Sequence, residues 1–463
     1  MLLEISGSDI INFPKSEIDR FNELINIYNY HADKNEEKDA YYEGKISLSS
    51  VNLGIALPNG LKDLEIGCSW GAKTVDVLAA RSMFDGFVGA NGEDIEGLDE
   101  LVIGNNLISE YMKATRDELK YGCTFATLSK SNDIGCKIRL HSPNTAAARW
   151  SGEKNRIDCG FAIISTVPDD SEAVTYTPSE INYYTESATF VLFMWDGLWY
   201  SREFKHNLGR PLMEAFIWNA TSNKPFGRSR IKEPIRRLID GYVRTLANAS
   251  IALEFSTAPQ KYILGVNDEQ FDKITSDKFK AYVGSVLAAT TNYETGEKPT
   301  VGQFSQGTLS PHIEMIRMLA TQFSAATGLT VTDTGVVSEA NPTSADAVLA
   351  QTQTLIGMAE QLNAGNGVAL RNIALMAIAI KNDTTIEDLT DQQKAVVAHF
   401  KNPAMPSLAS TADAAIKISS AREGFGNTDV FLEMIGFDKA EIRRIKAQEA
   451  KTRGLATLTE MET

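Results

Sequence analysis

The N-terminal part of the chain carries apolar residues every three or four positions, which is the spacing of amphipathic helices. This pattern predicts helices over residues 16–44, 72–83 and 98–120. Ser16 is placed to cap the first helix and Gly44 to end it. The apolar face of that first helix consists of Phe21, Leu24, Ile25 and Tyr28. Such helices need a sheet or one another to cover their apolar sides.

The pattern changes between Cys123 and about Trp218. Short stretches rich in β-branched and aromatic residues, such as CTFATLS, CGFAIIST and ATFVLFMW, are separated by Asn, Asp, Gly and Pro. This alternation is typical of consecutive strands joined by turns. The region is therefore predicted to be a run of antiparallel strands.

Two long rods follow, separated by a small lobe. The first begins near Arg230, has Pro234 in its first turn and carries a single apolar line. That line is Ile231, Ile235, Leu238, Tyr242, Leu246, Ala249 and Leu253. The second rod is predicted to be capped by Ser310 and ended by Gly328, with Pro311 at its first helical position. Its face is Ile313, Ile316, Leu319, Ala320 and Phe323. The segment 254–308 between the rods mixes strand-like and helical patterns.

Residues 329–343 show no helical period and are predicted to be a loop without secondary structure. A loop of about 15 residues is uncommon in a compact domain and is usually functional or disordered. Ser344 then opens a very long helix through roughly Lys381, in which NAGNG at 363–367 predicts a kink or a brief break. The remaining tail reads as helical pieces, including residues 386–400.

Composition limits the classes of function. The 463 residues are 43% hydrophobic and 23% charged, which is ordinary for globular domains, and the length suggests several lobes. A net charge of −15 argues against a surface that grips nucleic acid throughout, although it allows DNA to pass without sticking. The N-terminus lacks a signal-peptide pattern, and the apolar stretch 368–380 is too short for a bilayer. We therefore expect a soluble protein made inside the cell, with no membrane association.

The motifs that could carry chemistry are weak. GCSWGAKT at 67–74 fails as a phosphate loop because of its glycine spacing and Ala72, and predicts a loop entering a helix with Trp70 packed. Asp169-Asp170 is better explained as a turn. The four cysteines and five histidines form no metal-binding pattern, and we expect free thiols, no metal, no cofactor and no enzyme activity.

The first rod carries an unusual concentration of positive charge. Residues 228–253 hold two acidic residues, Glu233 and Asp240, against six basic ones. The basic residues are Arg228, Arg230, Lys232, Arg236, Arg237 and Arg244. A solvated helix face is the simplest explanation, and a docking surface for an acidic partner or a phosphate is the functional one.

Several blocks, spread over almost the whole chain, resemble the portal proteins of tailed bacteriophages. YYEGK at 41–45, SWGAKTVDVLAARSMFDGF at 69–87 and NNLISEYMKATRDELKYGCTFATLS from Asn105 are similar to the family's N-terminal helices and the turn into a strand. HNLGRPLMEAFIWN and the block from Phe226 to Gly265 are the most specific, with Gly-Arg-Ser, Leu-Ile-Asp and Ala-Pro-Gln elements in the family's order. EMIGFDKAEIRRI resembles the closing helix pair, whereas Lys224-Pro225-Phe226 and the short tail depart from the pattern.

The resemblance implies an α+β, multi-lobed portal fold and a homododecameric ring at one capsid vertex, through which DNA is packaged and ejected. The implied parts are a wing (1–227), a stem helix (228–253), a clip (254–308), a second stem helix (309–328), a tunnel loop (329–343), a long kinked wing helix (344–383) and a crown (384–463). The implied tunnel-lining residues are Val331, Asp333, Val336, Val337 and Glu339.

The resemblance also implies partners and a location. The partners are other copies of the chain, the large terminase subunit, a head-completion or adaptor protein, the major capsid and scaffolding proteins, and double-stranded DNA bound without sequence specificity. The location is the virion, and the host cytoplasm during assembly. Two alternatives remain open: an enzyme with an unrecognised site in 123–218, and another structural or scaffolding protein of a virion.

Overall fold

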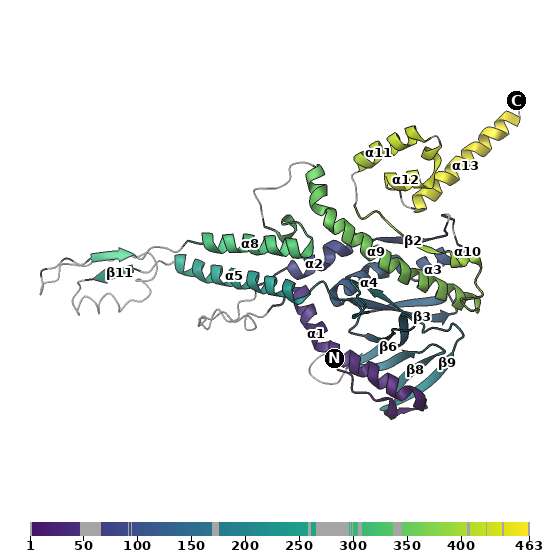
Figure 1. Ribbon diagram of the computed structural model, residues 1–463, viewed down its shortest axis with the longest axis horizontal. Helices are drawn as coiled ribbons and strands as arrows, with labels where there is room; N and C mark the ends of the chain where they lie inside the picture. The colour runs from purple at the N-terminus through teal and green to yellow at the C-terminus, as the bar shows by residue number, and fades with distance from the viewer. Residues whose placement is uncertain are drawn as a thin grey trace. The chain divides into compact units, whose positions relative to one another are not determined.

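The computed structural model describes residues 2–46, 66–90, 92–93, 95–168, 176–257, 261–264, 296, 298, 300–303, 308–336, 345–404, 408–422, 424–437 and 439–461. The chain forms two compact units. Unit 1 consists of Met1–Asp39, Thr74–Ile231 and Pro342–Thr463, and unit 2 of Ala40–Lys73 and Lys232–Asn341. Helices and strands both contribute, so the protein has the mixed α and β composition that the sequence predicts (Figure 1).

Unit 1 contains the predicted run of strands, arranged in two sheets. The large sheet has the order β1-β9-β8-β7-β6-β5 and is antiparallel except where β1 pairs with β9. Its strands are β1 (Ile10–Ile11), β5 (Ala146–Ser151), β6 (Arg156–Pro168), β7 (Tyr176–Tyr184), β8 (Ala188–Trp195) and β9 (Leu198–Lys205). The small antiparallel sheet, β10-β3-β4, consists of β3 (Cys123–Ser131), β4 (Gly135–His141) and β10 (Met213–Ile217).

Each face of the large sheet contributes to a different hydrophobic core. Helix α1 (Ile18–Glu43) covers one face, and its predicted apolar residues pack against the inward side chains of β6, β7 and β8. The small sheet lies against the other face at β5 and β6, and the helices α4 and α9 cover the small sheet in turn. The layers therefore run α1, large sheet, small sheet and helices.

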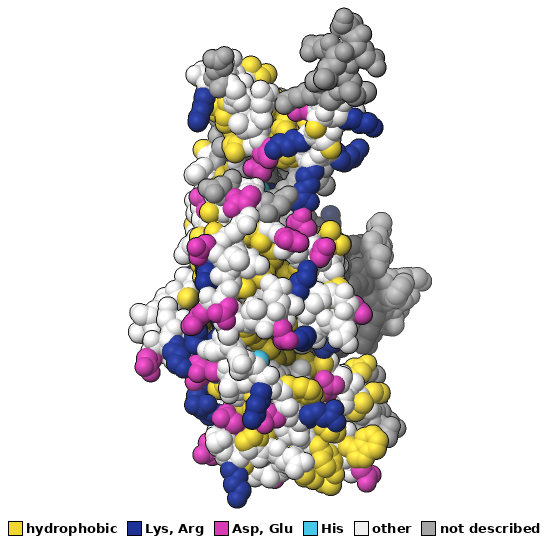
Figure 2. Space-filling model, turned by 90° about the vertical axis from the view of Figure 1, so that its right-hand side faces the viewer, with side chains coloured by type: hydrophobic (Ala, Val, Ile, Leu, Met, Phe, Trp, Pro, Cys, Tyr) yellow, Lys and Arg dark blue, Asp and Glu magenta, His cyan; other side chains and the backbone are white. Residues whose placement is uncertain are grey.

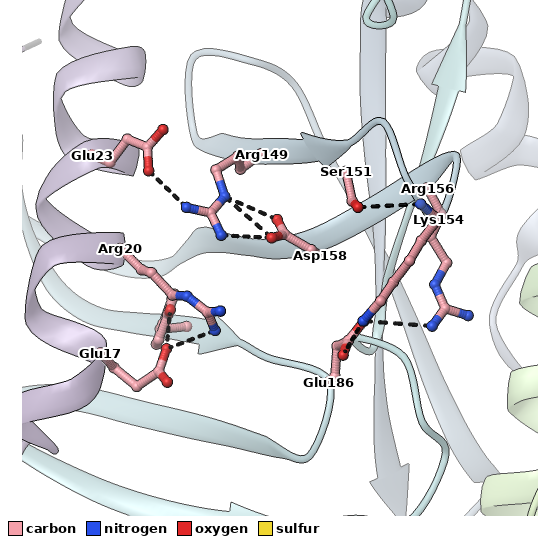
Figure 3. A network of polar contacts seen from close by, with 10 residues as sticks. Glu17, Arg20, Glu23, Arg149, Ser151, Lys154, Arg156, Asp158 and Glu186 are labelled. Atoms are coloured by element: carbon pink, nitrogen blue, oxygen red, sulfur yellow. Dashed lines mark hydrogen bonds and ion pairs between the residues drawn. The ribbon is translucent and has the colours of Figure 1, made fainter.

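Charged residues tie α1 to the exposed edge of the large sheet (Figure 3). Arg149 on β5 donates to Asp158 on β6 at 2.6 Å and to Glu23 on α1 at 2.8 Å. Glu186, in the turn between β7 and β8, accepts from Lys154, in the turn between β5 and β6, at 2.6 Å. Because these side chains are partly exposed, the pairs contribute more to orientation than to stability.

The predicted helix over 98–120 is two helices, α3 (Leu98–Gly104) and α4 (Leu107–Tyr121), and Gly122 ends the second. Asn105 breaks the helix because its side chain is used elsewhere. Its Nδ2 donates to the carbonyl oxygens of Leu101 and Cys136, and its Oδ1 accepts from the backbone N–H of Ile138. The buried amide thus fastens the end of α3 to β4. The helix predicted over 72–83 is α2 (Trp70–Ala79).

Of the kink or brief break predicted at 363–367, the break is contradicted, because α9 (Ala345–Asn382) is one continuous helix. Its glycines sit where α9 passes close to neighbouring elements: a Cβ on Gly367 would lie 3.5 Å from the Phe400 ring. Asn366 is fully buried between them. Tertiary contacts therefore hold as helix a segment that glycine alone would weaken by about 1 kcal/mol per residue.

The tail is only partly the series of helices that the sequence predicts. Helices α11 (Leu408–Ala421), α12 (Asp429–Ile435) and α13 (Lys439–Met461) confirm it. Residues 386–400, predicted helical, instead form the short α10 (Asp391–Lys394) and the strand β13 (Val397–Phe400), which pairs with β2 (Phe84–Val88). Short 3-10 turns occur at Gly7–Asp9, Lys15–Glu17, Thr332–Thr334 (η4) and Phe425–Asn427.

Unit 2 contains the two predicted rods. They are α5 (Glu233–Thr257) and α8 (Ser310–Thr327), and the antiparallel pair of β11 (Lys261–Leu264) and β12 (Thr300–Gln303) lies between them in sequence. Pro234 falls in the first turn of α5, and Gly328, with a φ of 76°, ends α8. Leu309, not Ser310, occupies the N-cap of α8, and its side chain makes no capping hydrogen bond. Ser310 is already helical, with Thr308 Oγ1 donating to its hydroxyl at 3.0 Å.

Candidate functional site: the paired helices and the turn that follows

Helices α5 and α8 run side by side in opposite directions (Figure 1). The buried side chains of α8 are Leu319, Ala320, Phe323 and Thr327, so the predicted face is right in its second half, whereas Ile313 is 49% exposed. On α5 the buried line is Ile235, Ile239, Val243 and Ala247. It shares only Ile235 with the line predicted along this helix. Gly241 allows the close approach, since a Cβ there would lie 3.3 Å from a Leu319 methyl.

Trp70 fills the space where α5, α8 and the following turn converge. Its ring stacks on Tyr242 with centroids 4.2 Å apart and lies 4.7 Å from the Phe323 ring. The indole Nε1–H donates to the Thr334 carbonyl oxygen at 3.1 Å, and the side chain is 1% exposed. The predicted packing of Trp70, at the point where GCSWGAKT enters a helix, is therefore confirmed.

The end of α1 contributes a polar contact to the outer side of α5. Tyr41 Oη donates to Asp240 Oδ1 at 2.8 Å, and the Arg236 guanidinium lies 5.8 Å from the Tyr41 ring centroid. Gly44 must be glycine here because its φ is 71° and a Cβ would lie 2.7 Å from the Cys68 carbonyl oxygen. These contacts fix the rotation of α5 about its own axis and so determine which way its other charged side chains point.

The six basic residues predicted as one stem face are not equivalent. Arg230 is only 7% exposed: its Nε donates to the Thr74 carbonyl at 2.7 Å and its guanidinium lies over the Trp218 ring. Burial lowers the pKa of Arg230 to about 10. Its inclusion in an exposed face was wrong, and it is a structural residue of unit 1. Arg228, also in unit 1, is exposed and precedes α5.

Lys232 directly precedes α5, and the remaining basic residues lie on α5 and share it with acids. Lys232, Arg237 and Arg244 are exposed, and Arg236 is half-buried. Arg237 forms an ion pair with Glu233 at 2.6 Å, one helical turn earlier. Arg244 follows Arg237 by seven residues and therefore shares that side of the helix with Glu233 and Asp240. This side of α5 alternates in charge. On the molecular face shown in Figure 2, basic and acidic side chains are likewise interspersed.

The segment after α8 begins with an ordered turn, which corrects the prediction that it lacks secondary structure. Thr332–Thr334 form the 3-10 turn η4, and Gly335 ends it with a φ of 78°. Asp333 Oδ2 accepts from both the backbone N–H and the hydroxyl of Thr330, each at 2.8 Å. Leu329 is buried below the turn.

The predicted tunnel residues are therefore only partly placed. Val331, Asp333 and Val336 are half-buried in or beside the turn, and Val337 and Glu339 lie outside the described residues. Most of the predicted clip, 254–308, also lies outside them. The sequence missed the local role of Asp333; the only signal was a threonine three residues before an aspartate, the spacing of a side-chain-capped turn.

The strand-rich region contains titratable groups that serve structure. His141 Nε2 lies 2.9 Å from the Thr127 hydroxyl, and burial lowers the pKa of this histidine to about 4. All four cysteines are free and buried, and burial raises the pKa of each thiol, in Cys68 to about 11 and in Cys123, Cys136 and Cys159 to about 12. Within the described ranges, no group of three or more His, Cys, Asp or Glu residues is arranged to hold a metal ion. The helices described there also include none that is long and apolar enough to cross a bilayer.

Comparison with protein families and curated proteins finds no match for this sequence. Among solved structures, the chain is similar to one in the virion of a native gene transfer agent particle, with 10% identity, a TM-score of 0.45, and coverage of 84% of this chain and 90% of that chain. It is also similar to a chain in the neck of the empty particle, with 12% identity, a TM-score of 0.45, and coverage of 82% of this chain and 95% of that chain. A chain in the neck of the native particle computed with C12 symmetry has 12% identity, a TM-score of 0.44, and coverage of 85% of this chain and 98% of that chain. Because TM-scores below 0.5 do not establish a shared fold, these similarities assign no function to this chain.

Proposed function

We propose that this protein is the portal subunit of a tailed bacteriophage or a related particle. Twelve copies form a ring at one capsid vertex, and double-stranded DNA passes through its channel without sequence-specific contacts. The observation that carries the proposal is the order of elements: helix α5, an antiparallel strand pair, the antiparallel helix α8, a short turn and the 38-residue helix α9. This is the order of stem, clip, stem, tunnel loop and wing helix that the sequence resemblance implies.

The packing in unit 2 suits this role. A closed ring repeats one heterologous contact around an axis, so each subunit needs a stiff element that holds its angle. The stack of Trp70, Tyr242 and Phe323 makes α5 and α8 such an element. The acidic balance of −15 suits a conduit, since phosphate contacts are what make DNA binding tight.

The wider proposal includes partners and location. The segment between the two rods, within 254–308, docks the large terminase subunit during packaging and a head-completion protein afterwards. The ring also contacts capsid and scaffolding proteins, and the mature location is the virion. Deleting 254–308 should leave ring formation possible and abolish terminase binding.

Assembly is the direct test. Purified protein at micromolar concentration should show annular particles with a central hole in electron micrographs. Its native mass should be near twelve times the 50.7 kDa of the chain. A monodisperse monomer or dimer under the same conditions would contradict the proposal.

The tunnel assignment needs a substitution that separates charge from local structure. Asp333→Asn retains an acceptor for Thr330 while removing the charge, and Glu339→Gln does the same for its neighbour in the proposed loop. In a twelve-fold ring this removes up to about 24 negative charges, so DNA should bind more tightly and with a steeper salt dependence. Glu4→Gln with Glu153→Gln, which neutralises exposed wing residues, is the matched control. Equal DNA binding in both double variants would remove these residues from the tunnel.

A further inference from the structure

The large sheet of unit 1 is covered unequally on the side that faces the small sheet. Ala146 and Ala148 on β5, Ala162 on β6 and Tyr184 on β7 belong to the core shared with the small sheet. Three strands cannot cover six, and the described residues leave the same side of β8 and β9 open. Alternation with the buried residues Phe190 and Leu192 identifies the side chains that point there.

This open surface, the outer β8–β9 face, consists of Phe193, Trp195, Leu198, Tyr200, Arg202 and Phe204. Trp195 is 71% exposed, Leu198 52% and Phe204 51%. The rings of Phe193 and Tyr200 stack across the two strands, 5.9 Å apart, and Arg202 lies over Phe193. An antiparallel strand pair with a solvated side normally alternates apolar with polar residues. Here the apolar and aromatic residues of β9 lie on the open side, while Ser201, Glu203 and Lys205 lie on the opposite side, and β8 is largely apolar on both sides.

A groove of about 880 Å³ continues this face toward β3 and the end of α9. Buried polar atoms in its wall have no hydrogen-bond partner among the described residues: Asn182 Oδ1, Thr189 Oγ1 and both ring nitrogens of His206. The Thr185 backbone lies near enough to affect the pKa of His206, which burial lowers, but makes no hydrogen bond of normal geometry to the ring. More than about 90% of buried polar groups in native proteins are paired with protein or ordered water, so these atoms mark a place where bound water or a partner surface completes the hydrogen bonds.

We propose that the outer β8–β9 face and its groove are docked by a second copy of this chain. The assignment rests on the proposed ring, in which every subunit must bury one surface against a neighbour. With about 150–250 Å² for each aromatic side chain, the exposed fractions leave roughly 400 Å² of apolar surface. A stable interface buries about 800 Å² on each partner, with an apolar centre and a polar rim. The face and the groove supply these two components.

Charge favours another copy as the occupant. Arg202 is the exposed cation at the middle of the face, and its described contact is with the Phe193 ring. Each neighbouring copy carries a net charge of −15, so its surface offers carboxylates to Arg202. A polyanion such as DNA would meet Arg202 among apolar side chains, and in the groove it would meet Lys130 and Lys205 beside the carboxylates of Asp383 and Asp388, which is a poor phosphate-binding surface.

The first experiment removes the apolar face. Trp195→Asp with Phe204→Asp introduces charge at two exposed positions, so the fold should persist, as an unchanged circular dichroism spectrum and melting temperature would show. The concentration for half-assembly, measured by native mass spectrometry, should rise at least tenfold. The control is Tyr30→Asp on α1, whose side chain is 67% exposed, close to that of Trp195. Assembly of the folded double variant at the wild-type concentration would overturn the proposal.

The second experiment identifies the occupant. All four native cysteines are buried, so a maleimide carrying benzophenone should label Leu198→Cys alone. Irradiation should join two copies of the chain, and mass spectrometry should identify a peptide of this same protein. Assembled protein that gives no chain-to-chain product, or that is joined only to DNA added to the sample, would overturn the assignment.

The two proposals fail in different ways. If wild-type rings form while neither the charged variant nor the cross-link responds, the docking face is wrong and the portal proposal stands. If no ring forms but Leu198→Cys still cross-links copies in a smaller oligomer that the double variant dissolves, the docking face stands and the portal proposal fails.

Discussion

Helices α5 and α9 are both long, and their central contacts are of opposite chemistry. In unit 2, α5 meets α8 through an aromatic stack, with Trp70 against Tyr242 and Phe323. In unit 1, the middle of α9 meets α4 through hydrogen bonds: Asn366 Nδ2 donates to Glu118 Oε2 at 2.7 Å and to Tyr111 Oη at 2.9 Å. An apolar contact depends on shape, whereas a buried polar contact also fixes which residues must be opposite one another.

The polar contact continues beyond Asn366. Tyr111 Oη lies 2.8 Å from Ser82 Oγ, which donates to Asn363 Oδ1 at 2.6 Å. Two amides on successive turns of α9 therefore engage the same chain of hydroxyls. A shift of α9 by one turn would separate Asn366 from Glu118 and Asn363 from Ser82, at about 1–3 kcal/mol for each buried group left without its partner. The network thus sets the position of α9 along its axis. The aromatic stack around Trp70 instead positions α5 against α8 by shape alone.

The largest effect is expected from breaking the aromatic stack. Trp70→Ala should lower the free energy of unfolding by about 3–5 kcal/mol, because it removes a fully buried ring and leaves a cavity. Urea denaturation followed by circular dichroism measures this. Trp70→Phe keeps an aromatic ring and loses the bond to the Thr334 carbonyl, so its loss should be nearer 1 kcal/mol. Equal losses in the two variants would show that the hydrogen bond, and not the stack, holds unit 2.

Breaking the polar contact should cost less. Asn366→Ala leaves the Glu118 and Tyr111 oxygens without their donor, and the expected loss is about 1–3 kcal/mol in the same assay. Gln361→Ala, at an exposed position of the same helix, is the matched control and should have little effect. A loss in Asn366→Ala no greater than in the control would mean that the network does not position α9.

The ionisation of Glu118 distinguishes the two contacts further. The stability contributed by the polar contact of α9 should depend on pH, whereas that of the aromatic contact of α5 should not. Burial raises the pKa of Glu118 to about 8 from its usual 4.5, although the Asn366 hydrogen bond acts in the opposite direction. The folded state therefore holds a proton that the unfolded state releases near pH 4.5. The stability from this group is complete below about pH 4.5 and is lost as pH rises toward 8.

The free energy of unfolding should therefore fall by at most about 1.4 kcal/mol per pH unit between about pH 4.5 and pH 8, and it should level off above pH 8. Glu118→Gln should remove this slope while keeping an acceptor for Asn366. The unfolding free energies of wild type and variant, measured at pH 5, 7 and 9, should therefore diverge and then run parallel. Parallel curves over the whole range would show that Glu118 is ionised in the folded protein.

The elements that the sequence predicts are those with a local period. Residues close in sequence determine these elements. They are the strand region from Cys123, the helices α1, α5 and α8, and the end of α8 at Gly328. The errors occur where a distant residue decides. Asn105 ends α3 because it binds Cys136 and Ile138, about thirty residues away, and β13 is a strand because β2 is available to pair with it.

The candidate site follows the same division. The sequence indicates the paired helices and a packed Trp70, because a tryptophan at a helix start and long apolar lines are local signals. It places the buried line of α5 incorrectly, since Ile239, Val243 and Ala247 are buried in place of their neighbours, and the choice between adjacent lines depends on the elements packed around the helix. It also groups Arg230 with the exposed cations, since charge in a sequence carries no record of burial by Trp218 and Thr74.

The smallest effect is expected from the exposed charges of α5. Arg237 and Glu233 form a close pair at 2.6 Å, but their side chains are 76% and 63% exposed, so water and salt screen their attraction. Arg237→Ala should leave the urea midpoint unchanged at low and at moderate salt, because alanine also favours helix and the buried line of α5 is untouched. Arg237→Glu places two like charges one turn apart and serves as the sensitive control, with a small shift expected at low salt only. A clear loss of stability in Arg237→Ala would mean that α5 is held partly by surface charge, and the contrast between its apolar contact and the polar contact of α9 would then be a difference of degree. If stability is unchanged and ring assembly or terminase binding falls, the cation acts between molecules, as a docking surface on the stem requires.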